Sequence, residues 1–135
     1  AGATGRLRAH ALPSTVRRCP MYQSSYAAMA ADDYALARTQ EWRALDHAVT
    51  LLEEARPTGA ASPETIEAVG FLRRLWTLLI EDLGSAENGL PESLRASLIS
   101  IGLFALRQGE ALRLGQSDDF ESVIDVNKMI RDSLA

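Results

Sequence analysis

After Met21 the chain contains only three prolines, and the spacing of these helix breakers constrains the fold more than any other feature. Pro57, Pro63 and Pro91 separate long stretches in which apolar residues recur every three or four positions. This recurrence is typical of amphipathic α-helices, whereas half-buried strands alternate apolar and polar residues. No alternating run of strand length and rich in β-branched residues stands out. The sequence therefore predicts an all-α domain.

The first helical segment is expected over residues 33–55, because proline at position 57 cannot continue the helical hydrogen bonds. Residues 24–31 either extend this helix or form a short helix of their own, so the bundle has four helices or five. The last segment begins at Asp118, which has the spacing of a capping box with Glu121. Its apolar side carries Phe120, Val123, Ile124, Ile130 and Leu134.

The second segment, residues 63–83, is the most apolar and is expected at the centre of the bundle or on the floor of an exposed groove. Ser62 is predicted to cap its N-terminus and Gly84 to form a left-handed cap after its last residue. The third segment is expected over residues 91–114. The short connections favour antiparallel packing of successive helices.

The third segment has several faces. Gly102 and Gly109 each disfavour a helix, so we expect another helix to approach the backbone closely there. A second face contains small, weakly polar residues around Phe104, which is either buried by the fourth helix or free to anchor a partner helix. The main apolar stripe is expected to comprise Leu94, Leu98, Ile101, Ala105 and Leu112.

Charge is distributed unevenly along the chain. Residues 1–20 contain four arginines and no acid, leaving 10 Lys and Arg against 18 Asp and Glu, a net charge of −8, in residues 21–135. We expect residues 1–20 to be a flexible basic leader, either a tag, an upstream-translated segment or a disordered tail, and residues 21–135 to be the helical domain. The acidic domain disfavours a broad nucleic-acid surface, because phosphate affinity comes mainly from Lys and Arg.

Catalytic and metal sites are not expected. One cysteine and two histidines are too few for a Cys-rich or histidine-based metal centre, and no phosphate-binding, nucleophile-elbow or zinc-protease motif occurs. His47 has no catalytic partner at helical spacing. The apolar runs are too short for a membrane-spanning helix. We therefore predict no enzyme activity, no cofactor and no membrane insertion.

The candidate functional surface lies on the second and third segments. Arg73 and Arg74 either anchor a carboxylate or RNA phosphate, or pair with acids such as Glu67 and Glu81 or with another helix. We predict that the surface binds a partner through Phe71, Arg73, Arg74, Leu75, Trp76, Leu79, Ser97, Ser100, Phe104 and Arg107.

From Met21 to Leu134 the chain resembles FlaF, a family of small flagellar biosynthesis regulators of alphaproteobacteria. The matching stretches are MYQSSYA, RALDHAVTLLEEA, FLRRLWTLLIEDL, ENGLPESLRASLISIGL and VIDVNKMIRDSL, and their combination in this order is specific. The resemblance implies a helical cytoplasmic protein without enzymatic activity. It also implies binding to flagellin, the filament subunit, in the manner of a secretion chaperone, and action opposite FlbT, a regulator of flagellin messenger RNA.

Three functions follow from these observations. In the first, the domain binds an amphipathic terminal helix of flagellin and promotes flagellin synthesis and export. In the second, it regulates flagellin after transcription through RNA or a FlbT-like partner, with Arg73, Arg74, Arg95 and the leader as phosphate contacts. In the third, the apolar surface is buried in a homodimer. We predict the first.

Overall fold

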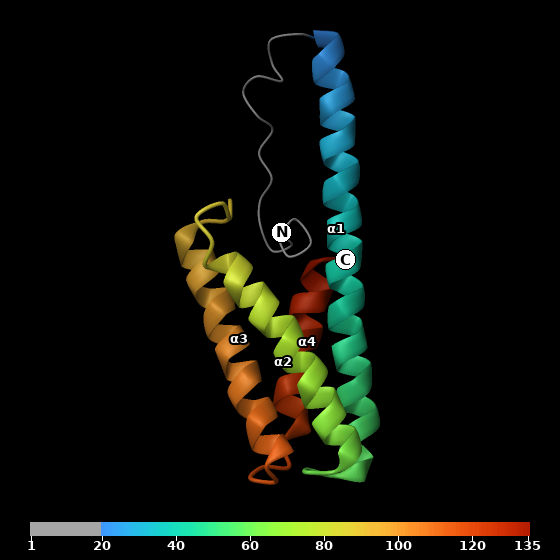
Figure 1. The fold of residues 1–135 in the computed structure, drawn as a ribbon, viewed down its shortest axis with the longest axis vertical. Helices are drawn as coiled ribbons and strands as arrows, with labels where there is room; N and C mark the ends of the chain where they lie inside the picture. The colour runs from blue at the N-terminus through green and yellow to red at the C-terminus, as the bar shows by residue number, and fades with distance from the viewer. Residues whose placement is uncertain (1–19) are drawn as a thin grey trace.

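The computed structural model describes the backbone from residue 20 and the side chains from residue 36. In this part of the chain four α-helices form the predicted bundle, with successive helices antiparallel (Figure 1). Except for Pro20, the expected leader lies outside the described residues. The helices are α1 (Pro20–Ala55), α2 (Pro63–Leu83), α3 (Glu92–Arg113) and α4 (Phe120–Ser133), and a 3-10 turn, η3 (Arg56–Thr58), follows α1.

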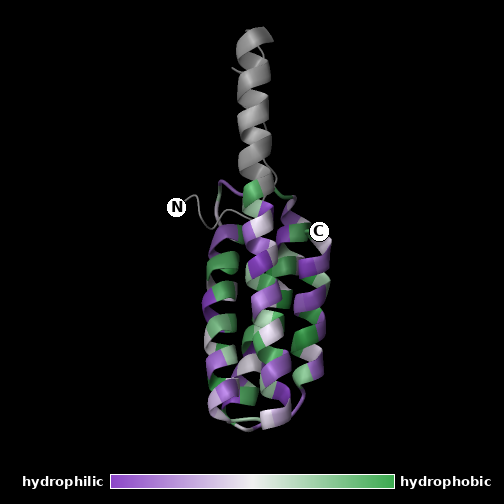
Figure 2. Cartoon of the chain, turned by 90° about the vertical axis from the view of Figure 1, so that its right-hand side faces the viewer, coloured by the Kyte–Doolittle hydropathy of each residue, from purple (hydrophilic) through white to green (hydrophobic). Residues whose placement is uncertain are grey.

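Each helix packs chiefly against two neighbours, so the bundle has a single central core. α1 lies beside α2 and α4, and α3 lies beside the same two helices. Hydrophilic and hydrophobic residues mix along the helices in Figure 2, as expected for helices that bury one side only. The largest fully buried apolar side chains are Trp76, Leu45, Leu52, Leu72, Leu83, Leu112 and Ile124.

Three predicted boundaries require correction. The first helix is one continuous element that begins at Pro20 rather than at residue 33, so residues 24–31 extend it. Gly84 has φ −82°, so it ends α2 without a left-handed residue. α4 is capped by Asp119, whose carboxylate accepts a hydrogen bond from the Ser122 backbone N–H at 3.1 Å. The predicted cap, one residue earlier, was wrong.

The N-terminus of α2 follows the prediction. The Ser62 hydroxyl accepts a hydrogen bond from the Thr65 backbone N–H at 3.1 Å, and Pro63 opens the helix. The buried Thr65 hydroxyl donates to the Gly59 carbonyl at 2.7 Å. The start of α2 is therefore fixed to the loop that precedes it.

α3 turns its glycines to the core, and this displaces the predicted apolar stripe. A Cβ at Gly102 would lie 2.6 Å from Cε3 of Trp76, and one at Gly109 would lie 3.1 Å from Cδ2 of Leu72. The predicted close approach of another helix is confirmed, and that helix is α2. Of the expected stripe only Ala105 and Leu112 are buried, whereas Leu98 and Ile101 are half-buried and Leu94 is 44% exposed.

A polar contact crosses the core between α2 and α4. The Trp76 indole N–H donates to Oδ1 of Asn127 at 2.8 Å, and the Asn127 amide donates to the Val123 carbonyl at 2.7 Å. Both side chains are fully buried. The indole N–H of Trp76 and the side-chain oxygen and N–H of Asn127 therefore all have hydrogen-bond partners inside the core.

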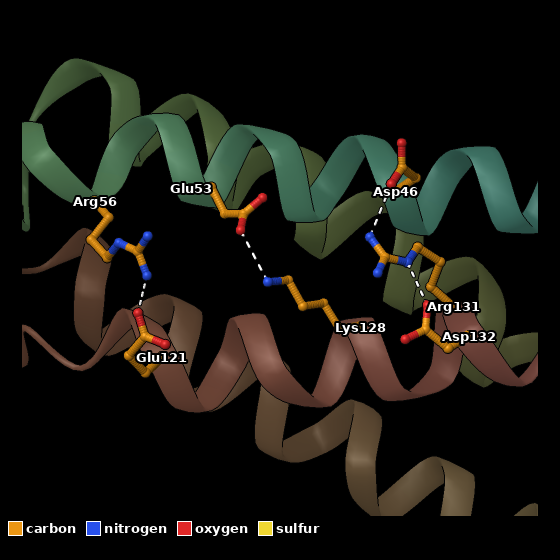
Figure 3. Close-up of polar contacts among 7 residues, drawn as sticks. All are labelled: Asp46, Glu53, Arg56, Glu121, Lys128, Arg131 and Asp132. Carbon is orange, nitrogen blue, oxygen red and sulfur yellow. Dashed lines mark hydrogen bonds and ion pairs between the residues drawn. The ribbon is translucent and has the colours of Figure 1, made fainter.

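Ion pairs connect α1 and its following turn to α4 (Figure 3). Lys128 Nζ lies 3.1 Å from the Glu53 carboxylate, and Arg56 pairs with Glu121. The guanidinium of Arg131 donates to Asp132 at 2.9 Å and to Asp46 at 3.0 Å. The hydrogen bond to Asp132 contributes most to raising the pKa of Arg131 above its ordinary value.

Candidate functional site

The ten residues of the predicted partner surface do not form one surface. Three of them belong to the core: Trp76 is fully buried, and Leu75 and Leu79 are 9% and 3% exposed. The other helices already cover these three apolar side chains, so they are part of the core and not of an exposed surface.

Arg73 lies at the boundary between α2 and α3. Its guanidinium approaches the Glu110 carboxylate at 3.4 Å, and the same carboxylate accepts a hydrogen bond from Nε of Arg113 at 2.7 Å. The hydrogen bond from Arg113 is the main cause that holds the pKa of Glu110 below its ordinary value. Arg73 therefore pairs with another helix, which is the structural alternative that the sequence left open.

Four predicted residues lie on the outward side of α3. The Ser97 hydroxyl donates to the Ser93 carbonyl at 3.0 Å, within its own helix. Ser100 and Arg107 are exposed, and Phe104 is half-buried. Phe104 is therefore covered only in part, and this side chain retains exposed surface.

Phe71 and Arg74 face α1 rather than α3. The ring of Phe71 meets the imidazole of His47 edge to face, with centroids 4.7 Å apart and planes at 89°. The guanidinium carbon of Arg74 lies 5.9 Å from the centroid of the same phenyl ring. The half-buried Phe71 is thus placed between a basic side chain of its own helix and a histidine of the neighbouring helix.

Two further residues extend this cluster along the helices. Leu78, 46% exposed, follows Phe71 and Arg74 at +7 and +4 on the same side of α2. Arg43 precedes His47 by one turn on α1 and is exposed. We call Arg43, His47, Phe71, Arg74 and Leu78 the α1/α2 face.

The arginines of the α1/α2 face differ from the basic residues on the α1–α4 side of the bundle. On the α1–α4 side, Arg56, Lys128 and Arg131 each pair with a carboxylate of the same chain (Figure 3). Arg43 and Arg74 have no ion pair within residues 36–135. Their positive charge is therefore available to a partner.

Sequence reasoning missed Arg43, His47 and Leu78 as parts of a surface. His47 was considered only for catalysis, and Leu78 was not among the ten residues of the predicted surface. The spacing of Phe71, Arg74 and Leu78 shows that they share one side of α2. No sequence signal showed that this side meets His47 of α1, because that depends on how two distant segments pack.

The described residues contain no cluster of side chains that could hold a metal ion. Between residues 36 and 135 no three His, Cys, Asp or Glu side chains lie together as a metal-binding group. None of the helices in the described part combines the length and the apolar character needed to cross a bilayer. The α1/α2 face combines an aromatic, an aliphatic and several basic side chains.

These features define a small all-α protein built as a four-helix bundle with charged and apolar surface residues. Residues 22–134 match the sequence profile of the family described as Flagellar protein FlaF, and the chain belongs to this family. The match confirms the resemblance noted in the sequence and gives the protein a flagellar role. FlaF is a flagellar protein family and not a known enzyme family. No curated protein and no solved structure showed significant similarity to the chain.

Proposed function

We propose that this protein binds flagellin in the cytoplasm as a secretion-chaperone-like factor and thereby promotes flagellin synthesis and export. Membership of a flagellar family is the observation that carries this proposal. Flagellin termini are amphipathic helices, and a free apolar helix face tends to associate prematurely. A protein that covers such a helix until export would keep the subunit monomeric.

The surface of the bundle supports capture of an apolar helix. Phe71 and Phe104 are only half-buried, and Leu78 is 46% exposed. Single exposed aliphatic residues are ordinary on any protein, but an aromatic and an aliphatic side chain two turns apart on one helix face form a suitable anchor pair. Phe71 and Leu78 have this arrangement.

Regulation through RNA or a FlbT-like partner is the alternative function. Arg73, one of its expected phosphate contacts, approaches Glu110, and Arg95 donates to the Leu83 and Leu90 carbonyls at 3.2 and 3.1 Å. These contacts occupy two of the three arginines expected to bind phosphate. The net charge of −4 for the whole chain also opposes phosphate binding, so flagellin capture is the better supported function.

The experiment is to mix the full chain with monomeric flagellin and measure mass by light scattering during size-exclusion chromatography. We expect a species with the mass of one copy of each protein, and slower flagellin polymerisation in its presence. Two separate peaks at concentrations far above a micromolar dissociation constant would exclude flagellin as the direct partner. The chain alone, run at several concentrations, tests the homodimer alternative.

A further inference from the structure

We propose that the α1/α2 face is the docking surface for the partner helix, and that this helix carries carboxylates beside its apolar side. The inference rests on the proposed function and adds the location and the chemistry of the contact. The occupant is a single amphipathic helix with an acidic border.

The geometry of the α1/α2 face fits a helix lying along it. Phe71 and Leu78 are seven residues apart, so two helical turns, about 10 Å, separate them along α2. An amphipathic partner repeats its apolar anchors at the same interval. The contact between His47 and Phe71 brings α1 alongside this pair, so residues of both helices make up the face.

The apolar part of the face is held in place before a partner arrives. His47 contacts one side of the Phe71 ring at a centroid distance of 4.7 Å, and Arg74 lies 5.9 Å from the same centroid. A ring positioned in this way loses little conformational freedom on binding. Leu78, 46% exposed, provides apolar area that a partner can cover.

The charge of the face selects the partner's chemistry. The chain as a whole has a net charge of −4, yet Arg43 and Arg74 have no ion pair within residues 36–135. Arg73 and Arg131, by contrast, lie beside carboxylates of their own chain. Two available guanidinium groups beside an apolar pair complement a helix whose apolar side is bordered by Asp or Glu.

The outward side of α3 is the competing surface. It contains the half-buried Phe104 and the exposed Arg107, together with the serines at positions 93, 97 and 100. These neighbours are small and polar, and a single helix supplies them all. The α1/α2 face is better suited because two helices line it and because it joins two apolar anchors with two available arginines.

The test measures affinity by fluorescence anisotropy for full-length monomeric flagellin and for two synthetic amphipathic peptides. The peptides share one leucine face and differ only in its border, which is Glu in one and Lys in the other. We expect Leu78→Asp in the full chain to weaken flagellin binding about tenfold or more. Leu103→Asp on α3 is the matched control, because Leu103 is 42% exposed and lies outside the face; we expect a change within about twofold.

The charge part of the proposal has its own readout. Arg74→Glu should weaken binding of flagellin and of the Glu-bordered peptide more than Arg74→Gln does. The wild-type chain should prefer the Glu-bordered peptide, and the double variant Arg43→Glu, Arg74→Glu should prefer the Lys-bordered peptide. A preference that does not change with these substitutions would overturn the acidic-border assignment.

The outcomes separate the location of the site from the proposed function. If the wild-type chain binds flagellin and Leu78→Asp and Arg74→Glu bind it equally well, the α1/α2 face is excluded while flagellin capture stands. Loss of binding only in Phe104→Asp would move the site to α3. A wild-type dimer that Leu78→Asp converts to a monomer would make the face a dimer interface. If neither flagellin nor the Glu-bordered peptide binds the wild-type chain, both proposals fail.

Discussion

The buried indole N–H of Trp76 depends on a single acceptor, the side chain of Asn127 at 2.8 Å. We expect Asn127→Ala to lower the free energy of unfolding by about 2 kcal/mol, because it leaves a buried donor without a partner and opens a small cavity. Urea unfolding followed by tryptophan fluorescence measures this change. Asp125→Ala, at an exposed position of the same helix, is the control. A loss below about 0.5 kcal/mol for Asn127→Ala would mean that this hydrogen bond contributes little to stability.

Two helical glycines offer a matched comparison at the residue scale. A Cβ at Gly102 would lie 2.6 Å from Trp76, whereas a Cβ at Gly70 would meet only the end of the Arg74 side chain at 3.7 Å. We expect Gly102→Ala to destabilise the bundle by about 1–3 kcal/mol through overpacking. Gly70→Ala should stabilise it by up to about 1 kcal/mol, because alanine favours the helix.

The thermal midpoints of the two glycine variants give the measurement, and they should move in opposite directions from that of the wild-type chain. Because both substitutions add the same methyl group to a helix, helix propensity contributes equally to both. Stabilisation of similar size in both variants would show that α3 does not approach Trp76 as closely as described.

At the scale of single elements, the start of α4 makes stability depend on pH. The hydrogen bond from the Ser122 hydroxyl to Asp119, at 2.5 Å, is the main cause that lowers the pKa of the Asp119 carboxyl. A lowered folded-state pKa contributes stability at pH values above the ordinary aspartate pKa, about 3.9. That stability is lost as the pH falls through the folded-state value.

We therefore expect the thermal midpoint of the wild-type chain to fall between pH 5 and pH 3, and to fall less in Asp119→Asn. Asparagine keeps the N-terminal cap but does not titrate. Asp118→Asn removes a neighbouring carboxylate that makes no side-chain hydrogen bond in the described part of the chain, so it should follow the wild-type midpoint. Equal acid sensitivity in all three proteins would contradict this role of Asp119.

Local signals predicted some elements well. Both ends of α2 were placed correctly, because Ser62 and Pro63 mark its start and Gly84 follows its end. The start of α1 was left open, since the sequence did not decide whether residues 24–31 extend the helix or form a short one, and the structure shows that they extend it. The cap of α4 was placed one residue too early, because Asp118 and Asp119 are chemically identical and only the folded backbone distinguishes them.

Properties that depend on how the helices pack against one another were harder to predict from the sequence. The sequence suggested a leucine-rich core stripe on α3, but Gly102 and Gly109 face the core because Trp76 and Leu72 of α2 fill the space beside them. The predicted site residues lie on different sides of the bundle for the same reason, namely the way in which the helices pack. Phe71 and Phe104 lie on adjacent helices, yet Phe71 faces α1 and Phe104 lies on the outward side of α3.

At the scale of the whole molecule, the charges of the bundle differ from side to side. Ion pairs between the chain's own residues connect α4 to α1 and to η3 (Figure 3). The Glu110 carboxylate of α3 pairs with Arg73 of α2. The α1/α2 face leaves Arg43 and Arg74 without such a carboxylate within residues 36–135. The proposed partner helix would supply the missing negative charge and cover Phe71 and Leu78.

The most direct test of flagellin capture is calorimetric titration of the full chain with monomeric flagellin at two salt concentrations and several temperatures. We expect saturable one-to-one binding with a negative heat-capacity change, because apolar helix surface is buried. Higher salt should weaken the binding, because it screens the attraction between the arginines and the partner's carboxylates. It should not abolish the binding, because the apolar contacts do not depend on charge. The absence of heat and of saturation under all these conditions would contradict the account and favour action through RNA or a FlbT-like partner.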